Sequence, residues 1–174
     1  MPQRLVSQDL QLRLIDEALG RNRLEQAVEE MMILFQDNRN RLGRLVEEGH
    51  IERILGAIAQ KDVPIAIEAA QQALKVAPAL ARSVIVDSLL TSAESSSGKN
   101  RPLALKALFS AATYTSDDPE RREKTVRQYL ACAEKWKDTD AKSAFEAAAN
   151  AEEFAASDPG LQIEVQEKRA ALSL

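Results

Sequence analysis

The sequence predicts an all-α protein built from stacked helical hairpins, a short α-solenoid of about eight to ten helices. Three prolines, Pro78, Pro119 and Pro159, each open an amphipathic segment, at intervals of 41 and 40 residues. A period of about 20 to 50 residues is typical of repeat architectures, because one hairpin cannot bury its own apolar face. Hydrophobic residues make up 45% of the chain and aromatic residues only 4%, which favours long helices over short strands.

The length of the chain predicts a single domain. A chain of 174 residues can bury one core or one short solenoid. We expect one helical-repeat domain over residues 1–174, with an N-terminal helical portion at 1–48 and hairpin repeats at 49–174. The net charge of −4 gives no reason to expect extensive nucleic-acid binding.

The composition also argues against several chemistries. Cys132 is the one cysteine and His50 the one histidine, so an intramolecular disulfide is impossible and a zinc site has too few ligands. Residues 1–12 mix Arg4 and Asp9 with leucines, unlike a signal peptide, and no stretch has the apolar length of a membrane span. We therefore expect a cytoplasmic protein without metal, cofactor or membrane contact.

The first 48 residues predict three helices. Leu10, Leu14 and Ala18 share one face of a helix that begins near Ser7 and ends near Gly20. An apolar stripe then continues through residues 24–46. Because Asn and Gly weaken its middle, we expect two helices there, with a bend near residues 37–40.

The first complete hairpin follows. An apolar stripe between Ile51 and Ile58 leads into a turn at Gln60–Asp62 and a second helix at 63–76. Residues 61–78, KDVPIAIEAAQQALKVAP, resemble the second helix of a tetratricopeptide repeat, because Ala66 and Ala73 are seven apart and Pro78 follows five residues later. The resemblance implies a tetratricopeptide-like α-solenoid in which small residues let two helices approach closely.

The preceding helix departs from that family's pattern. His50, Arg53, Ile54 and Ala57 stand where Trp, Leu, Gly and Tyr are expected. The intervals of 41 and 40 residues also exceed the usual length of about 34. HEAT-type hairpins are therefore an alternative, and the resemblance implies no particular partner.

The middle of the chain predicts a helix buried on every side and then a linker. Residues 78–93 are apolar all round, so we expect a central helix in which Leu89→Asp is among the most damaging changes. Residues 95–100, SSSGKN, read as a flexible linker. They lack the glycine and hydroxyl positions of a phosphate-binding loop.

Four more helices are predicted after the linker. The first spans 101–115, with Leu105, Leu108 and Phe109 on its buried face. Asp118 and Pro119 cap and open the next helix, and Asp158 and Pro159 repeat this signal for the last one. An alanine-rich helix from Ala141 to Ala155 lies between them. The last helix has no following partner, so it either caps the stack or docks on another molecule.

No catalytic constellation is recognisable. His50 lacks a partner and a pocket for a general base, and Cys132 lies beside an apolar stripe, which favours packing over nucleophilic chemistry. Adjacent acidic residues such as Glu29 and Glu30 point apart on a helix. We therefore predict a protein that is not an enzyme.

Two groups of residues are candidates for partner binding. Tyr129 and Trp136 share a helix face and could line an exposed aromatic groove. Basic residues form two clusters, which are balanced in part by nearby acids and otherwise suit acidic peptides or phosphates. The first cluster consists of Arg39, Arg41 and Arg44, and the second of Arg121, Arg122, Lys124 and Arg127.

Three functions remain open. The leading hypothesis is a non-catalytic protein-interaction module, an adaptor, chaperone or regulatory subunit that holds a peptide or helix of a partner protein. The second is polyanion or nucleic-acid binding through the Arg clusters. The third is a structural homo-oligomer joined through residues 24–46, where residues 31–35 form an apolar run longer than one buried stripe needs.

Overall fold

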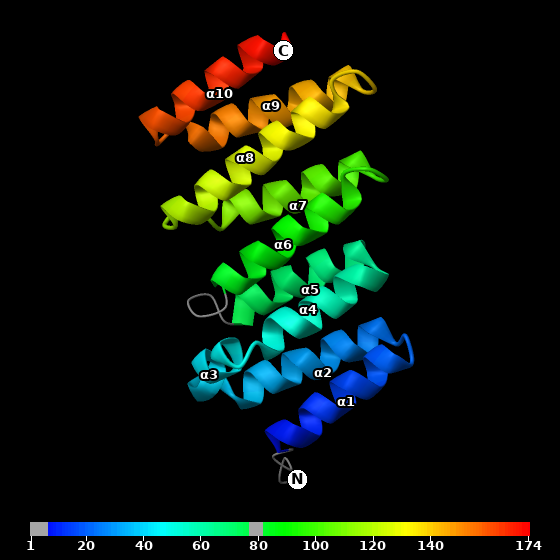
Figure 1. The fold of residues 1–174 in the computed structure, drawn as a ribbon. Coiled ribbons are helices and arrows are strands. Elements are labelled where there is room, and N and C mark those ends of the chain that lie inside the picture. Colours follow the sequence, from blue (N-terminus) through cyan, green and yellow to red (C-terminus); the bar gives the residue numbers. More distant parts are fainter. Residues whose placement is uncertain (1–6, 77–81) are drawn as a thin grey trace. The chain divides into compact units, whose positions relative to one another are not determined.

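The computed structural model describes residues 7–76 and 82–174, and these residues form ten α-helices and one 3-10 helix without any strand. The chain divides into two compact units, unit 1 (Met1–Ser88) and unit 2 (Leu89–Leu174). Neighbouring helices pack as hairpins within each unit (Figure 1). The predicted all-α stack of helical hairpins is therefore confirmed. The single domain over 1–174, with its division at residue 48, stays a prediction.

Unit 1 contains two hairpins and a short insertion between them. The first hairpin pairs α1 with α2, and the second pairs α4 with α5. The expected bend is confirmed, because α2 ends at Asp37 and a 3-10 turn precedes a short third helix. The elements are α1 (Gln8–Gly20), α2 (Leu24–Asp37), η1 (Arg39–Arg41), α3 (Leu42–Glu47), α4 (His50–Lys61) and α5 (Val63–Val76).

The buried face of α1 differs from the predicted one. Leu10 is 47% exposed and Leu14 is half-buried, whereas Ile15 is fully buried and Leu19 nearly so. Of the three predicted residues only Ala18 is buried, at 3% exposed. The rest of the buried stripe is shifted by one position and includes Gln11, whose amide donates to the carbonyl and carboxylate of Glu30 on α2. A polar residue can occupy the core here because its hydrogen bonds are satisfied.

Side-chain bonds join the two hairpins of unit 1 at the repeat spacing. Arg53 on α4 donates to Asp16 on α1 at 2.5 Å, and Lys61 donates to the carbonyl of Leu19 at 2.6 Å. The bonded residues are 37 and 42 positions apart. The Lys61 bond gives a second donor to the Leu19 carbonyl in the last turn of α1, which also accepts the backbone N–H of Asn22 at 3.1 Å.

The boundary between the two units falls inside α6 (Arg82–Ser96). The other helices of unit 2 begin at regular Asn or Asp caps, and three of them have proline at the first or second position. These caps are Asn100, Asp118, Asp140 and Asp158, whose side chains each accept a backbone N–H three residues later. The helices are α7 (Arg101–Thr113), α8 (Pro119–Trp136), α9 (Ala141–Ala155) and α10 (Pro159–Leu172).

Residues 95–100 are not the linker that the sequence predicts. Ser95 and Ser96 belong to α6, and Ser96 and Ser97 are buried. Their hydroxyls donate to backbone carbonyls three or four residues earlier, which keeps serines inside the helix and its final turn. Ser97 also accepts hydrogen bonds from Lys135 and Trp136 of α8, so this turn is fixed by the next hairpin.

The apolar residues next to Leu89 are buried as predicted, but the expectation of a helix buried on every side is wrong, because Val84 is half-buried and Thr91 is exposed. Ile85, Val86 and Leu89 have at most 1% of their surface exposed, and Leu90 has 7%. The helix start that the sequence predicts at Pro78 lies outside the described residues. The prolines at 119 and 159 open α8 and α10 as expected.

Candidate functional site

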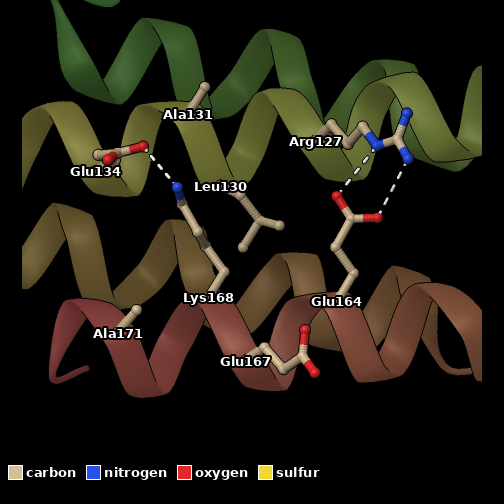
Figure 2. A pocket seen from close by; sticks show the side chains of 8 residues that line it. All are labelled: Arg127, Leu130, Ala131, Glu134, Glu164, Glu167, Lys168 and Ala171. Carbon is tan, nitrogen blue, oxygen red and sulfur yellow. Dashed lines mark hydrogen bonds and ion pairs between the residues drawn. The ribbon is translucent and has the colours of Figure 1, made fainter.

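Two grooves in unit 2 run between helices of consecutive hairpins. The first, the α8–α10 groove, lies between α8 and α10 (Figure 2). The second, the α7–α9 groove, lies between α7 and α9. Both contain charged and apolar side chains, but they differ in how far the charges are already paired within the chain.

The charges of the α8–α10 groove largely neutralise one another. Arg127 on α8 donates to both carboxylate oxygens of Glu164 on α10, at 3.1 and 3.2 Å, and Lys168 reaches Glu134 at 2.9 Å. These bonds raise the pKa of Arg127 and lower that of Glu134. In Figure 2 the two pairs bridge the helices on either side of Leu130, whereas Glu167 lies apart from both. The ion pairs of this groove therefore join α8 to α10.

The α7–α9 groove contains an exposed aromatic ring. Phe109 on α7 is 54% exposed, whereas Leu105, one turn earlier, is only 8% exposed. Phe109 was expected on the buried face, so this expectation is wrong: α7 buries Leu105, Leu108 and Ala112 but turns the ring outward. The groove is lined by Pro102, Leu105, Lys106, Phe109, Asp140, Lys142, Ser143, Glu146 and Asn150.

A series of aromatic contacts connects Phe109 to the core. Its ring meets Phe154 of α9 edge-to-face, with the centroids 6.0 Å apart. Phe154 in turn stacks on Tyr129 of α8 at 6.2 Å and with an interplanar angle of 9°. Such contacts fix ring orientation and are worth about 0.5–1.5 kcal/mol each beyond area burial. Phe109 is therefore a supported apolar anchor.

Tyr129 is fully buried, and its hydroxyl has no hydrogen-bond partner among the described residues. Burial, and then the nearby charges of Glu146 and Glu153, raise the pKa of its phenol. A buried hydroxyl without a partner costs about 1–3 kcal/mol. The aromatic contacts of the ring offset that cost.

The polar end of the α7–α9 groove is held by Asp140. Its carboxylate accepts from the hydroxyl of Ser143 at 2.7 Å and from the backbone N–H of the same residue at 3.0 Å, and it pairs with Arg101 at 3.0 Å. The Ser143 bonds, followed by the Arg101 bond, lower its pKa to about 2. This acid is therefore already engaged by the chain itself.

Two lysines of the α7–α9 groove are unpaired within the described residues. Lys106 and Lys142 are exposed and form no ion pair or hydrogen bond among the described residues. Lys142 also lies in the first turn of α9, which holds no acidic residue, so its charge opposes the helix dipole. Glu146, one turn further along α9, is likewise exposed and unpaired within the described part of the chain.

The structure places Tyr129 and Trp136 in the core of unit 2. Their exposed fractions are 0% and 1%, and the indole of Trp136 donates to the carbonyl of Ser97 at 2.8 Å. Neither ring lines an exposed groove, because the shared face of α8 is the one that packs inward. Two other rings of unit 2 reach the surface: Phe109 beside the α7–α9 groove, and Phe145 of α9, which is 53% exposed and lies 5.6 Å from the guanidinium of Arg169.

The second basic cluster is tied to acids and carbonyls of unit 2. Arg121 pairs with Asp118 at 2.9 Å and Lys124 with Glu120 at 3.6 Å. Arg122 donates to the hydroxyl of Ser157 at 2.6 Å and to the carbonyl of Ser116. Arg127 pairs with Glu123 and Glu164. A phosphate bound here would have to displace these partners.

The first basic cluster lies in unit 1, in η1 and α3. Arg39, Arg41 and Arg44 are all exposed. Arg44 donates to Glu48 at 2.6 Å, which raises the pKa of the guanidinium and lowers that of the carboxyl. Arg39 and Arg41 line a pocket with Ser7, Gln8 and Asp37. The two basic clusters thus belong to different units.

The apolar run at residues 31–35 is largely core. Met31, Leu34 and Phe35 are fully buried, Met32 is half-buried, and only Ile33 is exposed, at 42%. Homo-oligomerisation through residues 24–46 stays a prediction. A charged substitution at Ile33 would test this oligomerisation, because a charge at the buried Leu34 would unfold the helix pair instead of altering its surface.

Cys132 and His50 take structural positions. Cys132 is 4% exposed, and burial raises the pKa of its thiol to about 11, so it is protonated at neutral pH. His50 contacts Glu48 at 3.1 Å beside the left-handed Gly49. No group of three or more metal-ligating side chains occurs within residues 7–76 and 82–174, and no helix there could span a membrane.

Sequence reasoning missed Phe109, Lys106 and Lys142 as a group. Six of the seven residues from Leu103 to Phe109 are apolar, which is more than one inward face can hold, and this excess was the available signal. The lysines carried no signal, because only the packing of α7 beside α9 brings them to one groove.

Comparison with models of protein families, with curated proteins and with solved structures finds no match for this chain.

Proposed function

We propose that the chain is a non-catalytic protein-interaction module that holds a peptide or short helix of a partner in the α7–α9 groove. The observation that carries the proposal is Phe109, which is 54% exposed at a groove and yet held in place by Phe154. Exposed aromatic anchors on a rigid support dominate binding energy at protein interfaces. Two parallel-running helices offer the shallow channel in which an amphipathic helix can lay its apolar side.

The finer description of the fold belongs to the same proposal. We propose that the hairpins are tetratricopeptide-like, since small residues are buried where the sequence resembles that family: Ala66 is 4% exposed and Ala73 is 0% exposed in α5. The interaction module would act in the cytoplasm, as an adaptor, chaperone or regulatory subunit. An engaged Asp140 and a protonated Cys132 support a binding role more than a catalytic one.

The test is a selection of binding peptides on the purified full chain. A displayed library of random peptides is selected on the wild-type chain, and the affinities of the recovered peptides are measured for Phe109→Glu and for Ile163→Glu. Ile163 is a matched control, because it is 58% exposed on α10 outside the α7–α9 groove. Folding of each variant is checked by circular dichroism.

We expect Phe109→Glu to weaken the recovered peptides by about thirtyfold, the effect of losing a 2 kcal/mol anchor. Ile163→Glu should leave their affinity unchanged. Recovery of peptides that bind equally well to Phe109→Glu, or failure to recover any binding peptide, would contradict the proposed function.

A further inference from the structure

The α7–α9 groove differs from the α8–α10 groove in its free charge. In the α8–α10 groove, Arg127 and Lys168 are both paired with carboxylates of the neighbouring helix. In the α7–α9 groove, the carboxylate of Asp140 is already occupied by Arg101 and Ser143. What this groove still presents to an incoming chain is two unpaired ammonium groups, one unpaired carboxylate and an apolar ring.

The free charges lie on both helices of the groove. Lys106 precedes Phe109 by three residues on α7, so the ammonium group and the ring are about one helical turn apart. On α9, Lys142 is the second residue and Glu146 the sixth, and Lys106 is likewise the sixth residue of α7. The helix dipole acts within the first turn, so it adds positive charge beside Lys142 alone.

We infer that the preferred occupant is an acidic amphipathic segment of a partner protein, with a carboxylate side chain about one helical turn from a large apolar side chain. This inference rests on the proposed function and names the partner's chemistry. The apolar side chain lies on Phe109 and Leu105, and the carboxylates approach Lys106 and Lys142. The unpaired Glu146 disfavours an acid of the segment that lies close to it.

Charge complementarity of this kind acts on selectivity and on the association rate. Exposed ion pairs contribute about 0.2–1 kcal/mol each, so the lysines select among peptides that Phe109 already binds. Like charges opposite each other are unfavourable. The two lysines therefore repel a basic segment, just as they attract an acidic one. Salt should weaken the preference, because both lysines are exposed.

The experiment uses two synthetic helical peptides that differ only in charge. The acidic peptide carries Glu one turn from Leu, and the basic peptide carries Lys in place of each Glu. Binding to the full chain is measured at low and at high salt, for the wild type and for the double variant Lys106→Glu with Lys142→Glu. The control double variant is Lys99→Glu with Lys137→Glu, which changes the net charge equally at exposed lysines of unit 2 outside the groove.

The wild type should bind the acidic peptide about tenfold more tightly than the basic one, and the groove double variant should invert this order. The control double variant should retain the wild-type order, and Phe109→Glu should abolish binding of the acidic peptide. Equal binding of both peptides that still depends on Phe109 would overturn the acidic preference and leave the proposed function intact.

Two other results would also be decisive. Failure of Phe109→Glu to alter the binding of either peptide, or of any selected library peptide, would overturn the proposed function as well. A single-stranded oligonucleotide that competes with the acidic peptide, depends on both lysines and ignores Phe109 would assign the groove to polyanions and overturn the inference.

Discussion

The two units build helical hairpins from different core residues. In unit 1 the largest buried side chains are mostly aliphatic, including Ile15, Leu34 and Ile54, and Phe35 is its one aromatic residue. Unit 2 holds the other six aromatic residues. Both units bury alanines, such as Ala69, Ala70 and Ala73 in α5 of unit 1, but the largest set on one helix is in α9 of unit 2. The buried alanines of α9 are Ala144, Ala147, Ala148, Ala151 and Ala155.

This difference shows two ways to fill the space between paired helices. Branched aliphatic side chains of similar size interdigitate and tolerate small volume changes. A few rings packed against alanines allow the close approach of α8 and α9, but each ring and each alanine then has little freedom to change. Unit 2 should therefore be more sensitive both to removing a ring and to enlarging an alanine.

The largest effect is expected from Trp136→Ala in unit 2. The change removes a ring that is 99% buried and the hydrogen bond to Ser97, so the free energy of unfolding should fall by about 3–5 kcal/mol. Urea unfolding followed by circular dichroism measures it. Trp136→Phe keeps most of the apolar volume and should lose much less; equal losses in both variants would show that the indole N–H, and not ring volume, dominates.

A smaller effect is expected when an alanine is enlarged. Ala148→Leu in α9 should cost about 1–3 kcal/mol, because the fully buried site has no room for the added carbons. Ala170→Leu, at an exposed site of α10, should stay within about 0.5 kcal/mol. In unit 1, Ile54→Val should cost only about 0.5–1.5 kcal/mol. An Ala148→Leu protein as stable as the wild type would refute the contrast between the two cores.

The bond that joins the hairpins of unit 1 should contribute less. Lys61→Met keeps the aliphatic stem but removes one of the two donors to the Leu19 carbonyl, so we expect the free energy of unfolding to fall by about 0.5–1.5 kcal/mol. Hydrogen exchange should show faster exchange in the last turn of α1. Unchanged protection in that turn would mean that water replaces the lysine without cost.

The smallest effect is a pH dependence in unit 2. The pKa of Asp140 is lowered from 3.8 to about 2, so its contribution to stability is present above pH 4 and is lost as the pH falls through 2. Asp140→Asn keeps a capping side chain but not the charge. It should be less stable than the wild type at pH 7, and the difference should shrink between pH 4 and 2. A gap that stays constant over this range would exclude the carboxylate as its origin.

Local signals in the sequence were sufficient for most helix boundaries. Asp118 with Pro119 and Asp158 with Pro159 are complete start signals, because capping and proline geometry act within one turn. The bend after Asp37 followed from weak helix formers. The serine-rich end of α6 was missed because Ser favours turns in isolation, whereas here Trp136 and Lys135 of α8 hold the turn in place.

The candidate site was less predictable than the fold. Helical periodicity identifies an apolar face but not which helix will cover it, so Tyr129 and Phe109 were assigned to the wrong sides. The Arg residues of α8 stood out by number, yet tertiary contacts such as Arg127 with Glu164 engage them. Lys106 and Lys142 acquire a common role only through the packing of two helices.

The last helix carries one more consequence of the forty-residue period. Val126 and Tyr129 are fully buried in α8, and the positions forty residues later in α10 are Gln166 and Arg169. Gln166 is exposed, whereas Arg169 pairs with Glu152 of α9. A further helix laid along that side of α10 would strip water from the amide of Gln166 instead of covering an apolar residue, so this side is less suited to helix packing than the equivalent side of α8.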